Sequence, residues 1–271
     1  MPELPEIEVT RRLLRTRLRG HHVEDAHLKR EGKTTMPGAE ALPELRGRPL
    51  EELRRFGKIL VFEFGDLSLA AHLMLIGRIA LFPGGRNIPV EPRLRLTFAE
   101  GEELEVRFVA ARSLALLPTR DLQKYPAIAK QGPDALEISG EQFDEALRQV
   151  RGPVKNVFME QERIAGIGNA YADEILFDAR LDPFMPAGDL NEEQRERLYR
   201  AIAPALKRAI ELGAAAEYVE DLGPVEGISA KGDLMRVHNR LGKPCPKCGG
   251  RVQMKLLKGR NTFFCPACQR G

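Results

Sequence analysis

The sequence predicts a multi-domain α+β protein: an N-terminal helix with an antiparallel β-sandwich, then a helical domain that ends in a zinc ribbon. Three observations predict this fold class. Short apolar or alternating segments with turn signals fill residues 23–117, helical patterns fill 141–213, and four cysteines close the chain in two Cys-x₂-Cys pairs. With 271 residues, the chain can hold two domains and a small metal module. We expect domains at 1–128, 134–235 and 236–271.

The first expected element is a helix over residues 5–19. Pro5 suits the first helical turn, the glutamates around it favour the positive end of the helix dipole, and Gly20 is a suitable stop. Six strands are expected to follow, separated by turns such as Gly65-Asp66. They cover residues 59–64, 68–75, 78–82, 94–98, 104–108 and 114–117.

The second half of the chain begins with an expected linker at 126–133. Helices are then predicted over 141–150, 153–160, 168–179 and 191–213. Ser139 and Gln142 have the spacing of a capping box, and Asn191 is a suitable N-cap. Residues 217–235, rich in glycine and acidic side chains, are expected to form a loop before the ribbon.

The cysteines are the most specific local signal. Cys245 and Cys248 form one pair, and Cys265 and Cys268 form the other. Each pair presents two thiolates from one tight turn, so both pairs together form a closed tetrahedral site typical of one structural Zn²⁺. Disulfides are the alternative, but two pairs at this spacing favour zinc.

Positive charge is concentrated around these cysteines. Residues 236–271 contain nine Lys or Arg and no Asp or Glu, which leaves 33 basic and 39 acidic residues elsewhere. A basic metal-bound module in an otherwise acidic chain indicates a nucleic-acid partner. No secretory signal and no apolar run of roughly 20 residues is present. We expect a cytoplasmic monomer with no membrane partner, associated with the nucleoid if the source is bacterial.

The N-terminus has the composition of a catalyst. Methionine is normally trimmed before a small residue such as Pro2, and trimming would expose a secondary amine able to attack a sugar aldehyde carbon. Glu3 and Glu6 lie beside it, one helical turn apart, and could move protons. The alternative for both glutamates is helix capping. A retained Met1 would turn the Pro2 nitrogen into an amide and exclude this chemistry.

Four separated motifs occur in one order along the chain. They are residues 1–9 (MPELPEIEV), 56–60 (FGKIL), 166–177 (GIGNAYADEILF) and 260–268 (RNTFFCPAC). Together they resemble the formamidopyrimidine-DNA glycosylases of the Fpg/Nei family, from one end of the chain to the other. The resemblance implies a helix–two-turn–helix DNA-binding domain at 134–235, a catalytic β-sandwich domain before it, and damaged DNA as the partner.

The same resemblance implies a bifunctional DNA glycosylase and abasic-site lyase of base excision repair. Pro2 would attack C1′ of the damaged nucleotide and form a Schiff base, and β/δ-elimination would then cleave the strand. Glu3 would transfer protons and Glu6 would support the site. Base flipping is required because C1′ is inaccessible in a stacked duplex.

The resemblance also implies a set of DNA-binding residues. Lys58 would hold a phosphate next to the lesion and so belong to the catalytic set, while His72, Asn169 and Arg260 would provide further phosphate contacts. Taken singly, Lys58 and Arg260 could be solvated surface charges. The turn at 166–169 could be an ordinary one.

The chain departs from the family pattern where a wedge of side chains normally fills the gap left by the flipped nucleotide. Leu75 takes the place of the family methionine, Leu114 replaces an aromatic residue, and Arg112 is kept. Both leucines could instead be β-core residues. Poorer stacking predicts a weaker demand for a particular opposite base.

Two rival functions remain from the sequence. One is an abasic-site lyase with little base excision, which the altered wedge allows. The other is a non-catalytic protein that binds damaged DNA, against which the retained Pro2, Glu3 and Glu6 argue.

Overall fold

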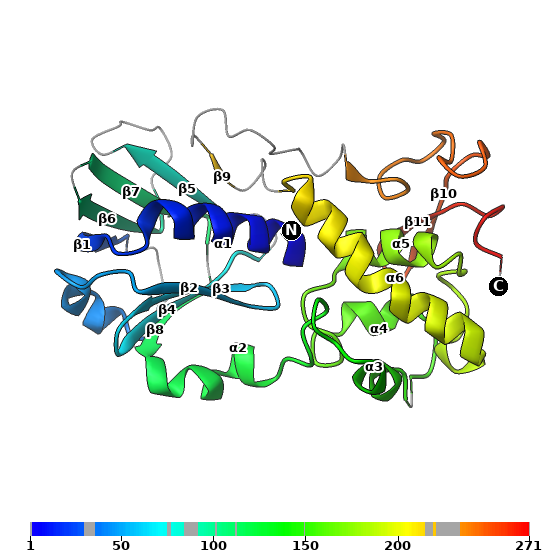
Figure 1. The fold of residues 1–271 in the computed structure, drawn as a ribbon, viewed down its shortest axis with the longest axis horizontal. Coiled ribbons are helices and arrows are strands. Elements are labelled where there is room, and N and C mark those ends of the chain that lie inside the picture. Colours follow the sequence, from blue (N-terminus) through cyan, green and yellow to red (C-terminus); the bar gives the residue numbers. More distant parts are fainter. Residues whose placement is uncertain are drawn as a thin grey trace. The chain divides into compact units, whose positions relative to one another are not determined.

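The chain folds into two compact units, which are shown in Figure 1. The computed structural model describes residues 2–29, 36–74, 77–83, 92–100, 102–111, 113–148, 150–214, 219–220 and 234–270. The first unit comprises Met1–Ala129 and Gly213–Ile228, and the second comprises Lys130–Leu212 and Ser229–Gly271. The chain therefore passes from the first unit to the second, back to the first, and again to the second.

The first unit contains α1 (Leu4–Leu18) and two β-sheets. One sheet has the order β2 (Glu52–Phe56), β3 (Ile59–Phe64), β4 (Leu67–His72) and β8 (Ser113–Pro118). The other has the order β1 (His22–Leu28), β6 (Leu94–Glu100), β7 (Glu102–Val109), β5 (Arg78–Pro83) and β9 (Val219–Glu220). Among the described strands of these two sheets, all neighbouring pairs are antiparallel except β5 with β9.

A single apolar core joins the two sheets. Phe62 on β3 and Phe108 on β7 meet edge to face, with ring centroids 5.5 Å apart. Leu14 and Leu18 of α1 are fully buried in the same cluster. The predicted N-terminal helix and β-sandwich are therefore confirmed, because alternate side chains of both sheets share one interior.

Some boundaries differ from the expectations. β1 and β2 were not expected as separate strands, because charged side chains interrupt their apolar pattern. Residues 126–133 are not wholly a linker, since Pro126–Ala129 form a short helix, α2, after the 3₁₀ turn Thr119–Lys124. A second 3₁₀ turn spans Ala39–Leu45. Most of the expected loop 217–235 lies outside the described residues, but Val219–Glu220 pair with β5 as a short strand.

The second unit contains the helices and the ribbon. Its helices are α3 (Gly140–Leu147), α4 (Lys155–Met159), α5 (Asn169–Asp178) and α6 (Glu192–Glu211), with a 3₁₀ turn at Ala187–Asp189. The ribbon hairpin consists of β10 (Gln253–Leu257) and β11 (Arg260–Phe264).

Two capping boxes mark helix starts in this unit. The Ser139 hydroxyl accepts from the Gln142 backbone N–H at α3, and the Asn191 side chain accepts from Gln194 at α6. Both caps were expected from the sequence. No helix among the described residues is long and apolar enough to cross a membrane.

Candidate functional site

The start of α1 brings the predicted catalytic residues together. The Glu3 backbone N–H donates to Oε2 of Glu6 at 2.7 Å, and the Glu3 side chain accepts from the Glu6 backbone N–H. Both carboxyl groups are almost fully buried, at 2% and 1% exposure. Glu3 and Glu6 therefore cap helix α1, which is the alternative role stated from the sequence. The same hydrogen bonds fix two carboxylates directly after Pro2 in the chain. Met1 lies outside the described residues.

Lys58 lies in the two-residue turn that joins β2 to β3. Gly57 precedes it with φ +52°, a conformation that favours glycine at the first position of such a turn. Arg55 donates to the Gly57 carbonyl at 3.1 Å and to the Glu8 carboxylate of α1 at 3.2 Å. The turn that carries Lys58 is thus tied to the second turn of α1.

Glu8 remains charged at this junction. Burial alone would raise the pKa of Glu8, but hydrogen bonds from Arg11 and Arg12 and the neighbouring guanidinium charges lower it to about 2. The ionised carboxylate can therefore hold Arg55 across the whole neutral range.

His72 lies next to Lys58, because it pairs with Ile59 in the register of β3 and β4. Burial lowers the pKa of His72 below its usual range, and the positive charge of Lys58 lowers it further. A neutral imidazole can still donate one N–H to an anion, and a bound phosphate would raise its pKa again. Two of the expected phosphate-binding residues are thus brought together in the first unit.

The wedge residues are only partly visible. Leu75 and Arg112 lie outside the described residues. Leu114 is 4% exposed, pairs with Ala71 and belongs to the core cluster of the sandwich. Leu114 is therefore buried as a β-core residue, which is the alternative stated from the sequence. In this conformation its side chain has no exposed surface that could enter a base stack.

Met74 occupies the position before Leu75 in an unusual conformation. Its φ is +54°, and its side chain is 47% exposed. After it, the Gly77 N–H donates to the Leu73 carbonyl at 2.8 Å. A non-glycine residue in the left-handed region costs about 1–2 kcal/mol.

Replacing this residue with glycine is expected to stabilise the protein. Met74→Gly should raise the free energy of unfolding by about 1 kcal/mol, because glycine adopts positive φ without the steric cost. The variant also removes the contact of Met74 Sδ with His72 Nδ1 at 2.8 Å, which Met74→Ala removes equally. Urea denaturation measures the change. Met74→Ala is the matched control, since it shortens the side chain but keeps the Cβ. An equal gain in both variants would contradict the backbone explanation.

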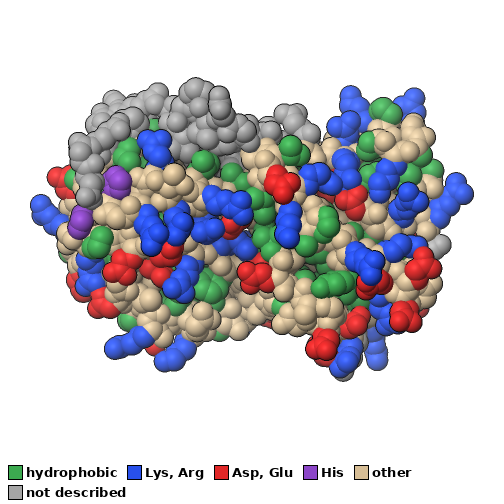
Figure 2. All heavy atoms as spheres, in the orientation of Figure 1, with side chains coloured by type: hydrophobic (Ala, Val, Ile, Leu, Met, Phe, Trp, Pro, Cys, Tyr) green, Lys and Arg blue, Asp and Glu red, His purple; other side chains and the backbone are tan. Residues whose placement is uncertain are grey.

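Asn169 and Arg260 line one pocket in the second unit. Asn169 is the first residue of α5 and its Nδ2 donates to the Asn261 carbonyl at 3.0 Å, while Arg260 begins β11. The pocket has a volume of about 230 Å³, and Lys258 also lines it. Figure 2 shows Lys and Arg side chains over the end of this unit that carries the ribbon. This arrangement suits an anion.

A buried ionic network lies beneath that pocket, and the sequence analysis missed it. Asp173 of α5 is fully buried, with Lys155 Nζ 2.6 Å from its Oδ1 and His238 Nδ1 2.7 Å from its Oδ2. The Phe263 backbone N–H also donates to it at 3.2 Å. The signal available in the sequence was a charged residue inside the apolar run AYADEILF.

Glu174, the next residue, anchors the segment that enters the ribbon. Its carboxylate accepts from the backbone N–H groups of Arg236, Val237 and His238 at 2.9–3.0 Å. Adjacent acidic residues of α5 therefore hold two different parts of the ribbon in place.

The four cysteines form one compact cluster. Their sulfur atoms all lie within 4.8 Å of one another, with Sγ–Sγ distances of 3.8 Å for Cys245–Cys268 and 3.6 Å for Cys248–Cys265. A tetrahedral site with Zn–S bonds near 2.3 Å requires sulfur separations of about 3.8 Å, whereas a disulfide requires about 2.05 Å. The cluster fits one structural Zn²⁺, and the disulfide alternative is wrong.

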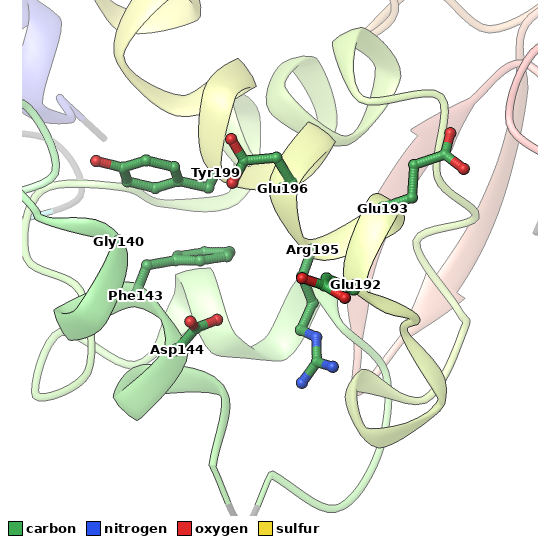
Figure 3. A pocket seen from close by; sticks show the side chains of 8 residues that line it. All are labelled: Gly140, Phe143, Asp144, Glu192, Glu193, Arg195, Glu196 and Tyr199. Carbon is green, nitrogen blue, oxygen red and sulfur yellow. The ribbon is translucent and has the colours of Figure 1, made fainter.

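A hollow of about 620 Å³ lies between α3 and α6. Figure 3 shows its aromatic pair, Phe143 and Tyr199, with four acidic side chains and Arg195 to one side of the pair and below it. The carboxylates that line it are those of Asp144, Glu192, Glu193 and Glu196. Their charge disfavours phosphate, so we assign no DNA contact to this hollow.

Three family models match the chain. The Formamidopyrimidine-DNA glycosylase N-terminal domain matches residues 1–117, and the Formamidopyrimidine-DNA glycosylase H2TH domain matches 131–220. The zinc finger found in FPG and IleRS matches 242–271.

Relatives with the name formamidopyrimidine-DNA glycosylase align with nearly the whole chain. The protein from Thermus thermophilus is 35% identical, with 99% of this chain and 98% of the relative covered. The one from Heliobacterium modesticaldum is 34% identical, and both chains are covered completely.

Solved structures have the same fold. A complex of Lactococcus lactis Fpg with DNA containing N7-benzyl-Fapy-dG has a TM-score of 0.87 and 28% identity, with both chains covered completely. A complex of that protein with abasic-site DNA has a TM-score of 0.85 and 29% identity, with 99% of this chain and 100% of the other covered.

Proposed function

The chain belongs to the formamidopyrimidine-DNA glycosylase family along its full length, and from this premise we propose that it excises damaged bases and then cleaves the DNA strand. It is a DNA repair glycosylase with a zinc finger.

In the proposed reaction, the Pro2 nitrogen attacks C1′ of the damaged nucleotide. The C–N bond to the base breaks, the base leaves with a proton, and the ribose ring opens to give an iminium on Pro2. The iminium accepts the electron pair released when a proton leaves C2′, so the 3′ phosphate departs by β-elimination. A second elimination expels the 5′ phosphate, and water releases the sugar fragment from Pro2.

The observation that supports this proposal is the pair of hydrogen bonds between Glu3 and Glu6 at the start of α1, directly after Pro2 in the chain. Glu3 precedes the helix and would exchange the proton with the opening ribose. Glu6 would hold the Glu3 backbone, and hence Pro2, in position. Burial of both carboxyl groups excludes bulk water from the proton transfer.

DNA binding would use both units. Lys58 and His72 would contact phosphate from the first, and Asn169 and Arg260 from the second. The zinc ion would hold the ribbon that presents Arg260, since a closed four-thiolate site gives structure and leaves no position for a reacting group.

Borohydride trapping on DNA with an abasic site tests the chemistry, with intact-mass analysis of the protein. A covalent adduct that maps to Pro2, on chains without Met1, is the expected result. The matched control is a preparation that retains Met1, which should give no adduct because its Pro2 nitrogen is an amide. Failure of the zinc-loaded, Pro2-first chain to form an adduct would leave a damage-binding protein as the better account.

A second candidate function follows from the burial of Leu114. A site without an aromatic wedge could open abasic sites efficiently and still excise bases poorly, because no large apolar side chain offsets unstacking. Comparing turnover on duplexes that carry a Fapy lesion or a preformed abasic site separates the two functions. Equal rates favour the glycosylase, and product from abasic DNA alone favours the lyase.

A further inference from the structure

We propose that Asn156 and Lys258 are phosphate ligands, which together with Asn169 and Arg260 bind one DNA phosphodiester in a single pocket. All four residues line the pocket of about 230 Å³ in the second unit. The inference rests on the proposed function, because DNA supplies the phosphate, and it adds two residues that neither the family motifs nor the sequence pattern indicated.

Asn156 has a polar group that needs a partner. Asn156 is only 8% exposed. Within the described part of the chain, its Nδ2 is buried without a hydrogen-bond partner. A buried amide N–H that makes no bond keeps its full desolvation cost. Phosphate oxygens are strong acceptors, so a phosphodiester in the pocket would satisfy this donor once the amide of Asn156 turns toward it.

Lys258 occupies a turn position that lysine rarely takes. Leu257 pairs with Arg260, which leaves Lys258 and Gly259 as the two-residue turn of the ribbon hairpin, with φ values of +47° and +76°. This turn class favours Asn, Asp or Gly at its first position. The positive φ of Lys258 motivates a functional hypothesis, and its charge fits an anion in the pocket that it lines.

The charges of the pocket favour an anion. Lys258 and Arg260 come from the ribbon hairpin, and the carboxylate that lines the pocket, Glu160, is paired with Arg163 at 2.6 Å. Lys155 also lines the pocket, but its Nζ is paired with Asp173 and donates to Thr262. Lys155 therefore belongs to the buried Asp173 network. The charges of Lys258 and Arg260 can therefore balance the charge of one phosphate.

Binding of the full-length, zinc-loaded protein to a duplex with an uncleavable abasic-site analogue tests the proposal. Asn156→Ala should weaken binding roughly tenfold through loss of one charge-assisted hydrogen bond. Asn156→Asp should weaken it by more, because a carboxylate repels the phosphate. Lys258→Ala should reduce the slope of log K against log salt by about one.

The controls separate a ligand from a structural residue. Thermal unfolding of Asn156→Ala should occur at or above the wild-type temperature, since the variant removes an unsatisfied donor, whereas a structural role would lower it. Lys243→Ala, an exposed ribbon cation outside the pocket, should leave the salt slope nearer to wild type than Lys258→Ala does.

The outcomes also separate this inference from the proposed chemistry. Wild-type affinity and salt slope in the Asn156 and Lys258 variants would overturn the pocket, even if the Pro2 adduct forms normally. If the wild type forms no adduct, the analogue still measures binding without any reaction. Weakened binding by the variants would then support the pocket and leave only the catalytic proposal contradicted.

Discussion

Removal of the zinc ion is expected to unfold the ribbon and to lower DNA affinity by roughly 100-fold, because Lys258 and Arg260 lose the hairpin that positions them. Structural zinc sites contribute about 10–16 kcal/mol in zinc-finger peptides. The apolar cluster of the ribbon is small and includes Cys245 and Cys265 themselves. The metal is therefore expected to be the main source of stability in this part of the chain.

Chelation and the Cys265→Ser variant test this expectation. Bound zinc is measured by atomic absorption, the ribbon by amide hydrogen exchange over residues 236–270, and DNA binding by titration. The core of the β-sandwich unit should keep its exchange protection, which shows that the loss is local. A zinc-free protein with unchanged ribbon protection and DNA affinity would contradict a structural metal.

Loss of the Asp173 carboxylate is expected to have the second-largest effect. Asp173→Ala would leave Lys155, which is 1% exposed, without its buried counter-charge. Breaking a buried ion pair on one side costs about 3–5 kcal/mol. The melting temperature of the helical unit should then fall on the order of 10 °C. His238 and the Phe263 backbone would lose the same acceptor, so DNA affinity should fall as the ribbon shifts.

A double variant distinguishes charge burial from packing. Lys155→Met with Asp173→Leu replaces both charges by apolar groups of similar size, and such replacements are often neutral. The double variant should recover most of the lost stability in thermal unfolding, although the His238 contact stays broken. Equal losses in the single and double variants would show that packing around α5, and not an unpaired lysine, sets the cost.

The local features of the fold were predictable because each depends on a few neighbouring residues. The capping boxes at Ser139 and Asn191 require a side-chain oxygen and a partner three residues later. Strand β3 was expected with the bounds it has, because its apolar run, interrupted only by Glu63, lies between two turn signals. The zinc cluster followed from the spacing within each cysteine pair.

The candidate site was predictable only in part. Glu3 and Glu6 are three residues apart in the chain, and a sequence shows that directly. Lys58 and His72 become neighbours through the pairing of β3 with β4, whereas the family resemblance implied only that each contacts phosphate. The role of Leu114 could not be predicted, because the sequence allowed either a DNA contact or a core position. The pairing of β8 with β4 buries its side chain in the core.

The sequence by itself determined the fold class, the helix caps, the metal ligands and the family motifs, because these are encoded in local spacing and backbone hydrogen bonding. Only the tertiary structure decided which polar groups are buried together. Asp173 meets Lys155 and His238 from three separate segments, and Asn156 meets the ribbon hairpin in one pocket. Burial and pairing of charge depend on how distant segments pack, and no pattern along the chain contains that information.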